Sequence, residues 1–144
     1  PVDLGAMLNE IASDLSQSGA PVSVTAQPVT LNVRNVAMRR AFRNLLENAQ
    51  RYGEGAKVTL SVREGDLCID IDDNGPGIPE DALEQVFEPF VRLEDSRSRD
   101  TGGTGLGLPI ARSILRAHGG DVVLLNRPEG GLRARVTLPL GSEL

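Results

Sequence analysis

Residues 67–78, with the sequence LCIDIDDNGPGI, decide the fold because an alternating apolar run ends there in two aspartates and a glycine-rich turn. Alternation of apolar with polar residues indicates a half-buried strand. Residues 58–62 alternate in the same way, and Glu64-Gly65-Asp66 between the two runs is turn material. We therefore predict a β-hairpin whose second strand delivers Asp73 to one end of a sheet.

Helices and further strands are predicted around this hairpin. Apolar residues at helical spacing, followed by glycine or proline, predict helices from Asp3 to a stop at Gly19, from Asn35 to Tyr52 and from Leu108 to Ala117, and a short helix from Glu80 to Phe87. Strands are predicted at residues 22–25 and 29–33, and a second hairpin joins residues 122–125 to 132–138. Residues 91–103 follow neither period and are predicted to form a mobile loop. The pattern implies an α+β fold, a two-layer α/β sandwich in which helices cover one face of a mixed, mostly antiparallel sheet.

Composition limits the class of protein. The chain has 144 residues, 40% of them hydrophobic, which suits one globular domain over residues 1–144. A net charge of −5 with scattered basic residues argues against nucleic acid as a partner. The single cysteine, Cys68, excludes an internal disulfide and favours an inert, half-buried thiol in a reducing compartment. No apolar run approaches the roughly 20 residues that span a bilayer, so we expect no direct membrane insertion.

A polar row runs beside the apolar face of the helix predicted from Asn35. Asn44, Asn48 and Arg51 are spaced four and three apart, so they share one helical face. A solvated helix edge explains such a row as well as a ligand site does. The row alone therefore decides nothing.

Two glycine-rich stretches are candidate ligand sites. In Asp73-Asn74-Gly75-Pro76-Gly77 the glycines let a flat ligand approach the backbone and Asp73 supplies an acceptor, although Asp-Asn-Gly is also ordinary turn chemistry. Residues 102–108, Gly-Gly-Thr-Gly-Leu-Gly-Leu, expose backbone N–H groups ahead of a helix N-terminus, so they suit phosphate oxygens or form a hinge. Leu108 and Ile110 stand where a dinucleotide-binding motif needs glycine, and the only lysine, Lys57, follows Ala56, which excludes a P-loop.

The stretch Phe87-Glu88-Pro89-Phe90 contains two of the three phenylalanines of the chain. It precedes the polar loop that contains Arg92. The rings can anchor a loop that closes over a ligand, or they can form a satellite core beneath it. The two interpretations are compatible.

In this order, the four stretches resemble the N, G1, F and G2 boxes of histidine kinase catalytic domains. These domains belong to the GHKL superfamily, which includes DNA gyrase, Hsp90 and MutL and has the Bergerat fold. The resemblance places the N box at residues 42–52, G1 at 73–77, the F box at 87–90 and G2 at 103–108. The segments 49–53 and 89–92 are most similar to osmosensor kinases of the EnvZ type.

The resemblance implies a nucleotide site that holds ATP and Mg²⁺. Asn48 would bind Mg²⁺ through its side-chain oxygen, and Asn44 and Arg51 would join it as catalytic residues. Asp73 would accept the amino hydrogen of adenine. The other implied nucleotide-binding residues are Tyr52, Gly75, Gly77, Ile78, Arg92, Gly103, Thr104, Gly105, Leu106, Gly107 and Leu108.

The resemblance also implies that the domain donates the γ-phosphate of ATP to a histidine on the dimerisation and phosphoacceptor domain of a parent kinase, which then serves a response regulator. No histidine of this chain is followed by Glu or Asp, because the only one, His118, precedes Gly119 at a predicted helix end, where a capping role fits. The first residue, Pro1, also suggests an excised piece. We expect a cytoplasmic domain of a bacterial parent bound to the inner membrane, with the phosphoacceptor domain absent from this chain.

One departure bears on the reaction. Water-activating members of the superfamily carry a glutamate four residues before the metal-binding asparagine, where this chain has Asn44, which cannot take a proton. Glu47, one residue before Asn48, points about 100° away around the helix. An ATPase conformational switch of the gyrase or Hsp90 type is therefore disfavoured, and a non-enzymatic ATP-binding or docking module stays open as an alternative.

Overall fold

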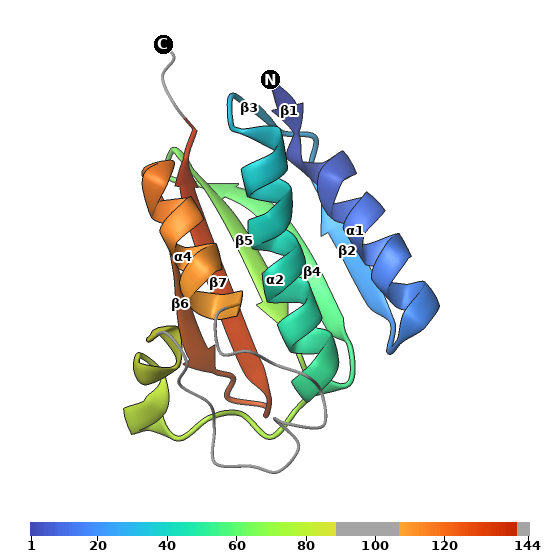
Figure 1. Cartoon of the computed structure of the whole chain (residues 1–144), viewed down its shortest axis with the longest axis vertical. Coiled ribbons are helices and arrows are strands. Elements are labelled where there is room, and N and C mark those ends of the chain that lie inside the picture. The colour runs from blue at the N-terminus through green and yellow to red at the C-terminus, as the bar shows by residue number, and fades with distance from the viewer. Residues whose placement is uncertain (89–106, 141–144) are drawn as a thin grey trace.

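A five-stranded sheet is the centre of the fold, with helices on one of its faces (Figure 1). The computed structural model describes residues 1–88 and 107–140. The strands lie in the order β2-β4-β5-β7-β6, and they comprise β2 Val22–Ala26, β4 Ala56–Arg63, β5 Asp66–Asp72, β6 Asp121–Asn126 and β7 Leu132–Pro139. Only β2 and β4 pair in parallel within this sheet, so the prediction of a mixed, mostly antiparallel sheet is confirmed.

The predicted hairpin around Glu64 is formed by β4 and β5. Its loop has φ of 51° at Glu64 and 84° at Gly65. Positive φ at both central residues defines a type I′ turn, whose twist matches that of the paired strands. In the resulting register Lys57 pairs with Asp72, so β5 ends beside the start of β4.

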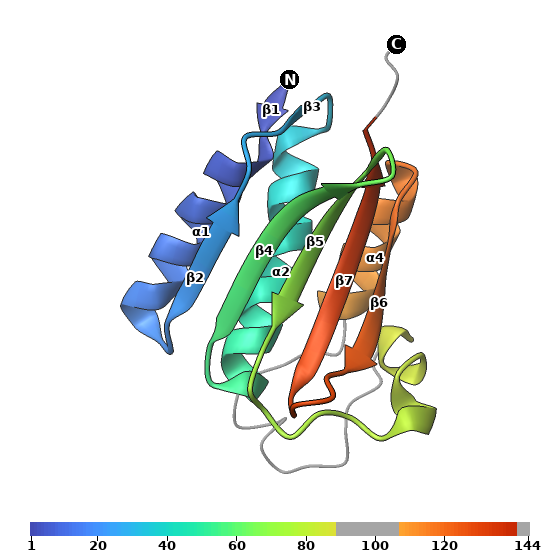
Figure 2. The ribbon, with the colours of Figure 1, turned by 180° about the vertical axis from the view of Figure 1, so that it is seen from behind.

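Within residues 1–88 and 107–140, three helices cover one face of the sheet, and Figure 2 shows the other face from behind. They are α1 Leu4–Ser18, α2 Asn35–Gly53 and α4 Gly107–Ala117. The Asp3 side chain caps α1 by accepting from the Ala6 N–H at 3.1 Å. The core between helices and sheet includes the fully buried Met38, Phe42, Leu60, Ile69 and Leu115. None of the helices among the described residues combines the length and apolar character needed to cross a membrane.

The end of α2 differs from the glycine stop that we predicted. Glu54, with φ of 62°, occupies the left-handed position after the helix. Gly55 follows with φ of 121°, and a Cβ there would lie 2.6 Å from the carbonyl oxygen of Pro21. The glycine is therefore needed for a close approach to the segment before β2 rather than as the helix cap.

Two predicted elements differ in detail from the structure. The strand predicted at residues 29–33 is present as the shorter β3 Thr30–Leu31, which pairs with β1 Val2–Asp3 in a separate two-stranded sheet. Residues 80–87 form two short 3₁₀ helices, η1 Glu80–Ala82 and η2 Gln85–Phe87, rather than one α-helix. So short a segment gains little from α-helical cooperativity, and burial of its apolar residues decides its shape. The loop predicted at residues 91–103 lies outside the described residues.

Candidate functional site

The polar row predicted on α2 lies beside the first turn of α4. Asn44 and Asn48 are half-buried and Arg51 is exposed. The Asn44 side chain donates from Nδ2 to the carbonyl oxygen of Gly107 at 3.3 Å. The structure therefore joins the polar row to the end of the glycine-rich segment, which lies 63 residues further along the chain.

Asp73 follows β5 and lies at the same end of the sheet as the C-terminus of α2 (Figure 1). Helix α2 ends at Gly53, shortly before β4, and Lys57 near the start of β4 pairs with Asp72 at the end of β5. Its side chain is buried, with 6% of the residue exposed. Oδ1 accepts the N–H of Gly75 at 2.9 Å and the N–H of Leu132 at 3.1 Å. The first of these bonds is an Asx turn, so the turn chemistry considered from the sequence is present together with a buried acceptor.

Burial raises the pKa of Asp73 above its ordinary value of 3.8, although the N–H groups of Gly75 and Leu132 and the charge of Arg127 lower it. No hydrogen bond to Oδ2 occurs within residues 1–88 and 107–140. A buried carboxylate that keeps one oxygen for a partner is suited to accept a hydrogen bond from a ligand.

In the glycine turn after Asp73, the prediction that a side chain does not fit is confirmed at Gly77. Gly77 has φ of 80°, and a Cβ there would lie 2.6 Å from Oδ1 of Asn126. Ile78 is half-buried and packs against the core. Both of its backbone polar groups are bound by Asn126.

Some predicted nucleotide-binding residues cannot be placed. Arg92, Gly103, Thr104, Gly105 and Leu106 lie outside the described residues. Tyr52 belongs to the last turn of α2, and Gly107 and Leu108 begin α4. The structure thus assembles the α2 row, the start of α4 and the turn after β5, and it leaves the roles of all these residues as predictions.

Glu47 is held away from the polar row, as its helical phase predicted. It accepts from Nε of Arg43 at 3.1 Å, and Arg43 also binds Asp14 of α1 at 2.7 Å. This side of α2 therefore faces α1, whereas Asn44 faces α4. The described residues contain no cluster of three or more His, Cys, Asp or Glu that would hold a metal ion by itself.

Sequence reasoning missed Arg112 of α4, which is 9% exposed. Its guanidinium binds both carboxylate oxygens of Glu84 at 2.9 and 3.0 Å, and its Nε donates to Asp121 at 2.9 Å. It also lies 4.1 Å from the centroid of Phe87. Arg112 therefore ties the buried F-box ring to the helix that follows the glycine-rich segment. The spacing of Arg112 on α4 gave no signal of this, because its partners come from other elements.

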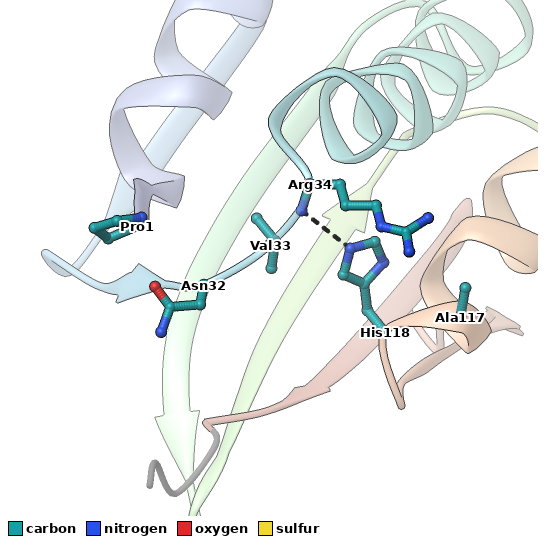
Figure 3. Close-up of a pocket in the computed structure, with 6 residues that line it drawn as sticks. All are labelled: Pro1, Asn32, Val33, Arg34, Ala117 and His118. Carbon is teal, nitrogen blue, oxygen red and sulfur yellow. Dashed lines mark hydrogen bonds between the residues drawn. The ribbon is translucent and has the colours of Figure 1, made fainter.

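His118 has the capping role that the sequence predicted, and Figure 3 shows its ring directed toward the backbone of Arg34. Its Nδ1 lies 2.8 Å from the carbonyl oxygen of Ile114, so Nδ1 carries the proton, and Nε2 accepts the N–H of Arg34 at 3.2 Å. The surrounding pocket, of about 360 Å³, is lined by Pro1, Asn32, Val33, Arg34, Ala117 and His118. This pocket is at the start of α2, roughly 20 Å along the helix from Asn48 at 1.5 Å per residue. It is therefore no part of the site around Asp73.

Comparison with known proteins identifies the family. Residues 33–142 match the family described as histidine kinase-, DNA gyrase B-, and HSP90-like ATPase. The sensor histidine kinase GtrS of Pseudomonas aeruginosa is 43% identical over 143 residues, which are 99% of this chain and 29% of GtrS. The mycobacterial sensor histidine kinase MprB has a similar structure, with a TM-score of 0.83 and 27% identity over 96% of this chain and 95% of that one. Full-length ShkA in complex with AMPPNP is also similar, with a TM-score of 0.79 and 26% identity over 96% of this chain and 30% of that one.

The chain therefore belongs to this ATPase family. Within it, the chain is the ATP-binding catalytic domain of a sensor histidine kinase. It spans 29% of GtrS and 36% of the sensor protein CutS of Streptomyces coelicolor. The likeness to EnvZ-type kinases in particular stays a prediction.

Proposed function

We propose that this domain binds Mg·ATP between α2, α4 and the turn after β5, and donates the γ-phosphate to a histidine on a separate dimerisation and phosphoacceptor domain. The observation that carries this proposal is the hydrogen bond from Asn44 to Gly107. It sets the polar row of α2 against the end of the glycine-rich segment, with Asp73 at the same end of the sheet. A base site and a phosphate site are thereby available on one side of the molecule.

The side chains divide the work between base and phosphates. Asp73 would accept from the adenine amino group with Oδ2, since its Oδ1 already serves the backbone. Asn48 would hold Mg²⁺, which would neutralise charge on the phosphates. Arg51, exposed in the last turn of α2, would approach the phosphates together with Asn44. Catalysis would then come from positioning and charge neutralisation.

Transfer to a protein is favoured over hydrolysis by the side chains beside the metal ligand. Asn44 occupies the position of a general base and has no carboxylate. Glu47 is engaged by Arg43 on the side of the helix that faces α1. General-base catalysis is typically worth about 10²–10⁴ in rate, so its loss leaves water a poor acceptor.

The acceptor and the regulator are assigned by the same proposal. We infer that a parent kinase bound to the inner membrane of a bacterium supplies the phosphoacceptor domain, and that a response regulator takes the phosphate from it. The coverage of only 29% of GtrS is consistent with further domains in such a parent.

Transfer of label from ATP tests the proposal. The domain is incubated with γ-labelled ATP, Mg²⁺ and a separately expressed phosphoacceptor domain, and label is followed on both proteins and as free phosphate. We expect label on the acceptor, none on this domain and little free phosphate. Asn48→Ala should abolish transfer, whereas Asn9→Ala, on α1, should leave it intact. Rapid release of phosphate by the domain alone would instead support an ATPase switch, and binding without transfer would support a docking module.

A further inference from the structure

The connection between β6 and β7 holds the turn after β5 through the side chain of Asn126. This amide donates from Nδ2 to the carbonyl oxygen of Ile78 at 2.6 Å and accepts the N–H of Ile78 with Oδ1 at 3.0 Å. One side chain therefore satisfies both backbone polar groups of Ile78, as a neighbouring strand would. Ile78, at the far end of the turn, is thus held by a residue 48 positions further along the sequence.

Arg127 fixes the near end of the same turn. Its Nη1 donates to the carbonyl oxygen of Asp73 at 2.7 Å and to Oδ1 of Asn74 at 3.2 Å. Leu132, at the start of β7, accepts the Asp73 N–H at 2.9 Å and donates to Oδ1 of Asp73. The backbone and the carboxylate of Asp73 are thus held from the β6–β7 connection.

Two further features indicate that this contact is tight. A Cβ on Gly131 would lie 2.0 Å from the carbonyl oxygen of Asp73, so only glycine permits the approach. The Nε of Arg127 is buried and has no hydrogen-bond partner among the described residues. A buried donor without a partner is costly. Arg127 therefore keeps a geometry that is not optimal for its own hydrogen bonds but reaches Asp73 and Asn74.

We propose that Asn126 and Arg127 are positioning residues for the nucleotide site, which hold residues 73–78 in the shape that presents the Asp73 carboxylate and Gly77 to the base. This role rests on the proposed function, because it needs adenine to bind at Asp73. The printed contacts of the two side chains with the turn are to Ile78, to the Asp73 carbonyl and to Asn74, so the role needs no contact between them and the nucleotide. They would raise affinity by preorganising the turn before the nucleotide arrives.

The alternative is that these hydrogen bonds only stabilise the fold, and a matched variant separates the two cases. Arg135 lies on β7 and makes a similar two-pronged contact, with Asp70 at 2.9 and 3.3 Å, on the open face of the sheet. Arg135→Met therefore removes an arginine from the same strand pair without touching the turn. It should lower the unfolding temperature and leave nucleotide affinity unchanged.

The experiment compares wild-type protein with Arg127→Met, Asn126→Ala, Arg127→Lys and Arg135→Met. The Kd of Mg·ADP is measured by calorimetry well below each unfolding temperature. We expect Arg127→Met and Asn126→Ala each to raise Kd by roughly tenfold or more, because a loosened turn must be ordered on binding. Arg127→Lys keeps one cationic donor and should recover part of the loss. If Arg127→Met does not fold, Asn126→Ala and Arg127→Lys still test the role.

A second readout needs no nucleotide. The amide NMR signals of Gly75 and Gly77 should shift in Arg127→Met and Asn126→Ala, and stay in place in Arg135→Met. If the first two variants lose stability as Arg135→Met does but keep Kd within about twofold of wild type, the positioning role is overturned. Unshifted Gly75 and Gly77 signals would overturn it as well. A wild-type protein that binds no nucleotide would sink the proposed function itself, a result distinct from both.

Discussion

Replacement of Asp73 by asparagine should separate nucleotide binding from stability. Asparagine keeps an oxygen that can accept from Gly75 and Leu132 as Oδ1 does now. It replaces Oδ2 with an NH₂ group, which would face the amino group of adenine donor to donor. Leaving such groups unpaired costs about 1–3 kcal/mol, which is about a 5- to 150-fold increase in the Kd of Mg·ADP.

The same change should not destabilise the nucleotide-free protein at neutral pH. Burial raises the pKa of Asp73 in the folded state. When the pKa of a carboxyl group is raised in the folded state, its protonated form contributes stability to the fold. This stability is fully present below the pKa of the group in the unfolded chain, and it is lost as pH rises through the folded-state pKa. Ionised Asp73 therefore costs stability near pH 7, whereas neutral asparagine does not. The stability of Asp73→Asn relative to wild type should rise as pH increases from about 4 to 7.

Asp70→Asn is the matched control for this experiment. Asp70 is also a buried aspartate of the β5 region, 7% exposed, and it accepts from Arg135 on the open face. Its loss should lower the free energy of unfolding by about 1–2 kcal/mol and leave the Kd of Mg·ADP unchanged. Asp73→Asn is thus expected to raise the Kd without lowering stability, and Asp70→Asn to lower stability without changing the Kd.

Calorimetry with Mg·ADP and urea unfolding at several pH values make up the assay. An unchanged Kd in Asp73→Asn would remove Asp73 from the recognition of adenine. A large loss of stability in the same variant at pH 7 would refute the inference that its ionised form is unfavourable in the folded protein.

Three further predictions concern the fold around the site. Arg112→Met should lower the free energy of unfolding by about 1–3 kcal/mol in urea titrations, because its mostly buried guanidinium binds Glu84 and Asp121. The control Arg116→Met removes an exposed arginine and should lower it by less than about 1 kcal/mol. Gly77→Ala should weaken binding of Mg·ADP, because φ is 80° and the new Cβ meets the Asn126 side chain. In the double variant with Asn126→Ala, the change in binding free energy should differ from the sum of the changes in the two single variants. Strict additivity would exclude the steric contact. Phe42→Ala should lower the free energy of unfolding by about 3–5 kcal/mol, because this side chain is fully buried, and a loss below about 1 kcal/mol would contradict its place in the core.

Local pattern was sufficient for the elements that bury one regular face. The helices at α2 and α4 and both hairpins were predicted within a few residues of their bounds. Segments shorter than two helical turns were predicted less well. Residues 80–87 became 3₁₀ helices because Val86 and Phe87 enter the core, and residues 29–33 paired with the first residues of the chain rather than with the sheet. In both places a contact far away in the sequence outweighed the local preference.

The class of fold and the three described stretches of the candidate site could be predicted from the sequence, because hydrophobic period, turn residues and motif order are properties of neighbouring residues. The place of Asn44 in the N-box-like stretch was predicted in the same way. Which residues support the candidate site depends on the packing of elements that are distant in the sequence. Arg127 reaches Asp73 across 54 residues and Arg112 reaches Glu84 across 28. Such contacts depend on how strands and helices pack in space, and arginine and asparagine side chains on a turn or a helix carry no local signal of the partner that packing brings to them.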